Sequence, residues 1–135
     1  MMKQEDKQLL LKDLCGRLPY GVKVQVCNAM EYTPILKGIL GDDLFLQFDY
    51  ITKPIKNGDS TYNLIEDNIK PYLRPMSSMT EEEKSEYDDY WYPGEYTNAV
   101  DVDELIDWLN GHYFDYRNLI ERGLALPAPE GMYKF

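Results

Sequence analysis

Residues 35–50, ILKGILGDDLFLQFDY, contain the clearest secondary-structure signal in the chain. Two apolar runs, Ile35 to Leu40 and Leu44 to Tyr50, flank the turn-forming sequence Gly41-Asp42-Asp43, which predicts a β-hairpin. The second run alternates, with Leu44, Leu46, Phe48 and Tyr50 on one face and Phe45, Gln47 and Asp49 on the other. We therefore expect two antiparallel strands with one buried face.

Further strands are predicted on both sides of this hairpin. Val22, Val24 and Val26 alternate with polar residues before it. After it, a turn-rich loop over 53–60 precedes short strands over 61–65 and 69–73. The segment 65–71, IEDNIKP, resembles the last turn and strand of a Tudor-type or Src-homology-type barrel. Residues 20–75 are thus predicted to form a small, strongly bent antiparallel sheet or barrel.

Helices are predicted before and after the strands. In residues 1–18, Leu11, Leu14, Cys15 and Leu18 recur at helical spacing, with Lys7, Lys12 and Asp13 on the other side. Gly16 and Pro19 predict that this helix stops near Cys15.

The part after the strands, residues 76–135, is predicted to be acidic and helical. Thr80 and Glu83 form a capping-box pattern that predicts a helix to about Tyr90. Asp101 and Glu104 repeat the pattern before a second helix. A last short helix is expected after Asp115, and residues 124–135 should run extended along the surface. The predicted fold is a single α+β domain over 1–135.

Length and composition limit the classes of protein that need to be considered. A chain of 135 residues can bury one core. Its two cysteines, Cys15 and Cys27, form no C-x-x-C pair and are expected to be buried reduced thiols. There is no apolar run of about 18 residues, and residues 1–6 are too polar for a signal peptide. We expect a cytoplasmic protein with no membrane contact.

The net charge of −10 comes from one stretch. Residues 81–107 contain eleven Asp or Glu residues and one basic residue, Lys84, whereas residues 1–75 sum to zero. Within that stretch the charge is interleaved with aromatic rings. The candidate partner-binding residues are Tyr87, Asp88, Asp89, Tyr90, Trp91, Tyr92, Glu95 and Tyr96. They are interpreted as aromatic anchors with a carboxylate rim that attracts a basic protein. The alternative is that Trp91, Tyr92 and Tyr96 fold back as lids on the sheet.

The sequence predicts no catalytic residue, cofactor or metal ligand. His112 is the only histidine, and no spacing pairs it with a thiol or hydroxyl nucleophile, so a packed or capping role is favoured. Carboxylates on adjacent helical turns could hold a cation: Asp101, Asp103, Glu104 and Asp107. Helix capping and a solvated face account for them without metal. No phosphate-binding loop motif occurs.

Nucleic-acid binding is the second alternative. The basic residues that could gather on one side of the sheet are Lys23, Lys37, Lys53, Lys56, Lys70 and Arg74. The net charge of −10 repels a polyanion at long range, so this alternative is disfavoured. A sharper variant of the acidic hypothesis is a DNA-mimic inhibitor, whose ordered carboxylates occupy a DNA-binding partner.

Several segments resemble a family. They are 9–15 (LLLKDLC), 18–24 (LPYGVKV), 70–83 (KPYLRPMSSMTEEE), 107–110 (DWLN), 112–117 (HYFDYR) and 123–133 (GLALPAPEGMY). Together they resemble a widespread family of small uncharacterised proteins of gut Bacteroidetes and their prophages or other mobile elements. The resemblance implies no activity, because that family has no assigned reaction. The functional hypothesis is a non-enzymatic protein-interaction module, with partner and oligomeric state left open.

Overall fold

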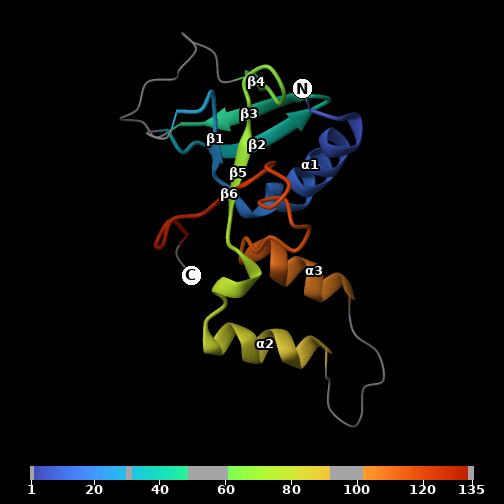
Figure 1. The fold of residues 1–135 in the computed structure, drawn as a ribbon, viewed down its shortest axis with the longest axis vertical. Helices are drawn as coiled ribbons and strands as arrows, with labels where there is room; N and C mark the ends of the chain where they lie inside the picture. Colours follow the sequence, from blue (N-terminus) through green and yellow to red (C-terminus); the bar gives the residue numbers. More distant parts are fainter. Residues whose placement is uncertain (1, 30–31, 49–60, 92–101, 134–135) are drawn as a thin grey trace.

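The computed structural model describes residues 2–29, 32–48, 61–91 and 102–133, and its elements form a mixed α+β fold (Figure 1). The helices are α1 (Gln4–Arg17), α2 (Glu81–Trp91) and α3 (Val102–Gly111), with short 3₁₀ turns η1 (Leu18–Tyr20) and η2 (Met76–Ser78). The strands are β1 (Val24–Gln25), β2 (Ile35–Leu40), β3 (Asp43–Gln47), β4 (Thr61–Asn63), β5 (Lys70–Leu73) and β6 (Leu126–Pro127).

The predicted hairpin is confirmed as β2 and β3. Leu40 pairs with Asp43 across a turn in which Gly41 has a φ of +62°, a conformation that glycine adopts at little cost. Leu44 and Leu46 are buried, whereas Phe45 and Gln47 are exposed, as their alternation predicts. Tyr50 and the predicted loop over 53–60 lie outside the described residues.

The strands form two three-stranded sheets, in the orders β2-β3-β4 and β1-β5-β6. The chain from Val22 to Val24 connects them, because Leu36 N–H donates to Val22 O (2.9 Å) and Val24 N–H donates to Pro34 O (3.0 Å). The two sheets are therefore linked by backbone hydrogen bonds, and the strong bend stays a prediction. Within the described residues the strands do not close, so the predicted barrel is not confirmed.

The sheet is also not purely antiparallel. Residues 124–135 were expected to run along the surface, but Leu126 and Pro127 pair in parallel with Tyr72 and Leu73 of β5. Leu124 and Ala125 are buried. The extended course of Leu126 and Pro127 is confirmed, but their pairing with β5 was not predicted, because a two-residue strand ending in proline has no recognisable strand pattern of its own.

Helix α1 differs from its prediction at its end and in its buried face. Gly16 does not terminate it: a Cβ there would lie 3.1 Å from Asn110 Nδ2, so glycine allows α3 to approach closely. The glycine with a left-handed backbone that was predicted at Gly16 is instead Gly21, which follows η1. The buried residues are Leu10, Asp13, Leu14 and Arg17, so Asp13 faces the core rather than solvent. Cys15 and Cys27 are both exposed, which corrects the expectation of buried thiols.

The short helix predicted after Asp115 is absent from the described residues, which form turns there. The Asp115 carboxylate still accepts hydrogen bonds from Leu119 N–H (2.8 Å) and Ile120 N–H (3.0 Å), as it would at the start of a helix. Asn118 has a φ of +58°, a left-handed conformation that interrupts a helix.

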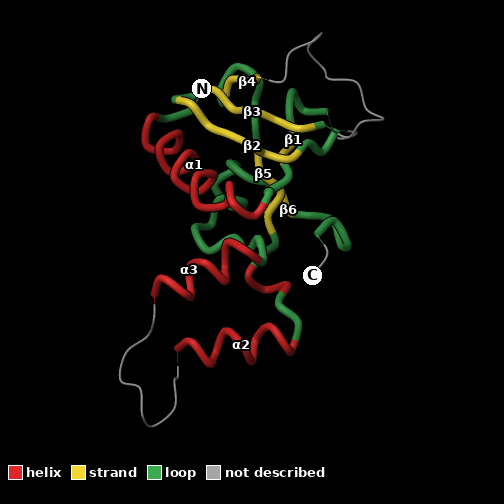
Figure 2. Tube along the Cα trace, turned by 180° about the vertical axis from the view of Figure 1, so that it is seen from behind, coloured by secondary structure: helices red, strands yellow, loops and turns green. Residues whose placement is uncertain are grey.

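Two apolar clusters divide the interior. The larger lies between α1 and the sheets and includes Leu14, Val24 and Leu36. The smaller consists of Leu105, Leu109 and Phe114, with partly buried residues of α2 and α3 packed against it. Figures 1 and 2 agree that α3 lies between α2 and the rest of the molecule, so α2 is the helix farthest from the sheets.

The C-terminal segment is held by a tyrosine. The Tyr133 hydroxyl donates to Tyr72 O (2.7 Å) and accepts from Lys23 N–H (3.0 Å). Its ring stacks on Tyr113 with centroids 3.7 Å apart, and burial raises the pKa of the Tyr133 hydroxyl.

We expect Tyr133→Phe to lower the free energy of unfolding by about 1–2 kcal/mol, because a backbone donor and acceptor lose their partner. Urea unfolding measures this change, and an unchanged midpoint would contradict the contacts.

Candidate functional site

Trp108 joins α2 to α3. Its ring lies 6.2 Å from the rings of both Tyr87 and Tyr90, measured between centroids. Its Nε1–H donates a hydrogen bond to Glu86 Oε2 at 3.0 Å. An indole buried on one side and hydrogen-bonded at its edge has a fixed orientation. Trp108 therefore acts as a rigid connection between the two acidic helices.

Two further rings stack with Trp108. The ring centroid of His112 lies 4.3 Å away and that of the fully buried Phe114 lies 5.7 Å away. His112 Nδ1 is 2.8 Å from Trp108 O. Because a carbonyl oxygen only accepts, Nδ1 carries the proton in this hydrogen bond. His112 thus has the packed role that its sequence context favours.

The start of α2 is fixed by the predicted capping box and by an ion pair that was not predicted. Glu83 N–H donates to Thr80 Oγ1 (3.1 Å), and Thr80 N–H donates to Glu83 Oε1 (3.0 Å). Arg74, which follows β5, donates to both Glu83 oxygens at 2.7 and 2.8 Å. These hydrogen bonds, first of all those from Arg74, lower the pKa of Glu83 to about 2. Glu83 is buried, so it anchors α2 to the sheet.

A groove crosses the α2–α3 surface. It consists of two shallow, open hollows of about 440 and 470 Å³ that share the lining residues Tyr90, Trp108 and His112, which we call its floor. We call it the α2–α3 groove. The walls of the first hollow include Tyr20, Glu104 and Asp107, and those of the second include Glu86 and Asp89. Each hollow therefore combines aromatic surface with two carboxylates.

Tyr20 reaches this groove from η1. A Cβ at Gly111 would lie 3.2 Å from Tyr20 Cε1, so the ring packs closely against the glycine at the end of α3. The Tyr113 hydroxyl donates to Tyr20 O and fixes the backbone there. Desolvation and the Asp107 carboxylate raise the pKa of the Tyr20 hydroxyl. The groove thus draws on three separate elements of the fold.

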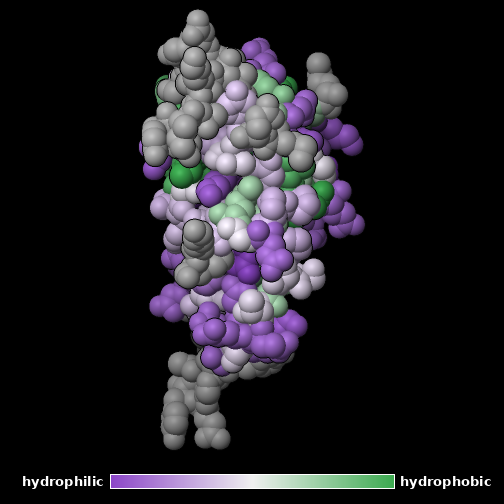
Figure 3. Space-filling model, turned by 90° about the vertical axis from the view of Figure 1, so that its left-hand side faces the viewer, coloured by the Kyte–Doolittle hydropathy of each residue, from purple (hydrophilic) through white to green (hydrophobic). Residues whose placement is uncertain are grey.

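The two helices are strongly negative. Their exposed carboxylates are Glu81, Glu82, Glu86, Asp88, Asp89, Asp103, Glu104 and Asp107. Lys84 is the only basic residue in these two helices, and its Nζ lies 3.7 Å from Glu81 Oε1. On the face drawn in Figure 3, hydrophilic side chains cover the end of the molecule that α2 and α3 form. This charge favours a cationic ligand.

The predicted site residues differ in how far they are exposed. Tyr87 and Tyr90 are half-buried against Trp108, Asp88 and Asp89 are exposed, and Trp91 is 47% exposed at the end of α2. The lid alternative is wrong for Trp91, which lies on the helix farthest from the sheets. The remaining three candidates, Tyr92, Glu95 and Tyr96, lie outside the described residues.

From the sequence, Glu104 and Asp107 were considered only as cation ligands, and Tyr20, Trp108 and Gly111, which also line the groove, were not identified. On α3 the residues Glu104, Asp107, Trp108 and Gly111 follow i, i+3, i+4, i+7 spacing, which places them on one helical face. Helix capping and a solvated face accounted for these carboxylates in the prediction. In the described residues, no three His, Cys, Asp or Glu side chains are grouped as metal ligands.

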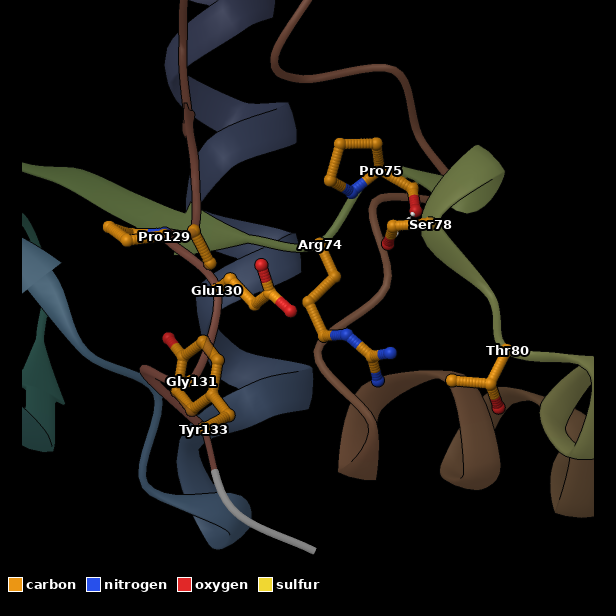
Figure 4. A pocket seen from close by; sticks show the side chains of 9 residues that line it. Arg74, Pro75, Ser78, Thr80, Pro129, Glu130, Gly131 and Tyr133 are labelled. Atoms are coloured by element: carbon orange, nitrogen blue, oxygen red, sulfur yellow. Dashed lines mark hydrogen bonds between the residues drawn. The ribbon is translucent and has the colours of Figure 1, made fainter.

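A second pocket, of about 420 Å³, lies between residues 74–80 and the C-terminal segment (Figure 4). Three of its polar side chains have partners within the protein. Arg74 binds Glu83, the Ser78 hydroxyl donates to Pro75 O (2.6 Å), and the Tyr133 hydroxyl binds the backbone. A ligand that used these side chains would have to displace those contacts.

Two of the basic residues considered for nucleic-acid binding have partners within the protein. Arg74 is committed to Glu83, and Lys23 Nζ donates to Met132 O at 3.0 Å. Lys53 and Lys56 lie outside the described residues. The described part of the sheet therefore offers fewer exposed cations than its sequence suggested.

The chain matches no family model, no curated protein and no solved structure. The family resemblance therefore stays a prediction. Among the residues with described structure, no helix has the length and apolar character needed to cross a membrane.

Proposed function

We propose that the protein is a non-enzymatic interaction module that binds a basic protein through α2 and α3. The observation that carries the proposal is the position of Asp88 and Asp89 in the last turn of α2, which contains no basic residue. The C-terminal end of a helix has a partial negative charge, so carboxylates there destabilise the helix. Sequences that break such a local rule without compensation often do so at functional sites. A cationic partner would supply the missing compensation.

Other features of this surface support the same proposal. Trp91 presents an exposed ring beside Asp88 and Asp89, and tyrosine and tryptophan are typical anchors of protein interfaces. The aromatic contacts of Trp108 hold the two helices in one arrangement before a partner arrives. Such preorganisation lowers the entropic cost of association.

The proposal predicts that stability and binding change in opposite directions. Replacing Asp88 and Asp89 together by asparagine should raise the free energy of unfolding by about 0.5–1 kcal/mol, because it removes repulsion from the helix end. The same variant should weaken binding of a fluorescein-labelled peptide of lysine, arginine and glycine by at least about threefold. Urea unfolding and fluorescence anisotropy measure the two effects.

The control changes the net charge by the same amount elsewhere. Glu66 and Glu121 are exposed and lie outside α2 and α3, so Glu66→Gln with Glu121→Gln should leave peptide affinity nearly unchanged. If both double variants weaken binding equally, attraction is due to net charge alone and the proposed surface is wrong. A loss of stability in the Asp88 and Asp89 variant would also contradict the proposal.

A further inference from the structure

The α2–α3 groove has features that suit one kind of cationic side chain. The rings of Tyr90, Trp108 and His112 line both hollows, and each hollow is also lined by two carboxylates. A guanidinium group is planar, stacks on aromatic rings and donates up to five hydrogen bonds, which two carboxylates can accept. The lysine ammonium group is compact and more strongly hydrated, so it gains less from an aromatic floor.

Contacts within the protein hold the rings that line the groove. Glu86 holds the Trp108 indole by a 3.0 Å hydrogen bond, and Phe114 supports the ring from the buried side. Tyr20 is held against Gly111 at the edge of the first hollow. Because these contacts exist without a ligand, the rings need little ordering when one binds.

We propose that the α2–α3 groove binds arginine side chains of the basic partner, one in each hollow. In the first hollow Glu104 and Asp107 accept hydrogen bonds from the guanidinium beside Tyr20. In the second, Asp89 takes the equivalent role at the other side of the Tyr90 and Trp108 floor. Because the hollows share that floor, a segment with two nearby arginines fits the whole groove. This inference rests on the proposed function and specifies the chemistry of the partner.

The test compares two short peptides, acetyl-Gly-Arg-Gly-Arg-Gly-amide and its lysine analogue, by calorimetry and by the fluorescence of the two tryptophans in the chain. The arginine peptide should bind at least about fivefold more tightly than the lysine peptide. Tyr20→Leu should lower this preference, because Tyr20 lines the first hollow, while the circular dichroism spectrum stays unchanged, because Tyr20 is 37% exposed. Asp107→Asn should weaken arginine binding by at least about threefold.

Phe45→Leu is the matched control for Tyr20→Leu, since Phe45 is a 39% exposed ring on β3, outside the groove. It should change neither affinity. If both peptides bind equally, or if the arginine preference survives Tyr20→Leu and Asp107→Asn, the inference is wrong and the proposed function still stands. If the folded protein binds neither peptide, both are overturned.

Discussion

Replacing Asp13 by asparagine is expected to lower the free energy of unfolding by about 3–5 kcal/mol, the largest effect of any single substitution considered. Asp13 Oδ2 accepts from Arg17 Nε at 2.8 Å, and Oδ1 accepts from Arg17 Nη2 at 3.1 Å and from Arg117 Nη1 at 2.7 Å. Both Asp13 and Arg17 are fully buried. Without the carboxylate, Arg17 would be a buried charge with no counter-charge.

Two further variants separate this charge effect from a general loss of packing. Asp6 lies 3.5 Å from Arg122, whose side chain is 55% exposed, so Asp6→Asn should cost less than about 1 kcal/mol. Adding Arg17→Met to Asp13→Asn should recover much of the loss, because it removes the unpaired buried charge. Urea unfolding at pH 7 measures all of them. Equal losses for Asp13→Asn and Asp6→Asn would contradict the buried pair.

The burial of Asp13 and Arg17 could not be predicted from the sequence. An acidic and a basic residue four positions apart on a helix are usually an exposed pair, and Asp13 was placed on the polar side of the predicted helix. Their burial depends on residues about one hundred positions away, since Arg17 also donates to Phe114 O at 2.6 Å. By contrast, the strands with strict alternation, such as β3, were predicted well because their pattern is local.

Only the part of the candidate site that is local in the sequence was predicted. The aromatic and acidic residues of α2 are adjacent in the sequence, so Tyr87, Tyr90 and Trp91 were identified. Tyr20 comes from η1 and Trp108 from α3, and only tertiary packing brings them to the same groove. The burial of Glu83 could not be predicted, because the acidic residues near it in the sequence are exposed.

Glu83 carries the second large prediction, because it attaches the proposed interaction surface to the rest of the protein. Its pKa is lowered from 4.5 to about 2, and each pKa unit corresponds to about 1.4 kcal/mol. Glu83→Gln should therefore lower the free energy of unfolding at pH 7 by about 2–3 kcal/mol. A carboxylate with a lowered pKa stabilises the folded state above pH 4.5. That contribution is lost as the pH falls from 4.5 towards 2.

The pH dependence gives this prediction a test that a packing defect would not pass. Between pH 7 and pH 2 the difference in unfolding free energy between the wild type and Glu83→Gln should shrink, with most of the change between pH 4.5 and pH 2. Glu82→Gln, an exposed neighbour in the same turn, should show a difference below about 0.5 kcal/mol throughout this range. A Glu83→Gln difference that stays constant with pH would mean that its ion pair with Arg74 contributes nothing. In that case the aromatic contacts of Trp108, rather than charge, would have to hold α2 in place.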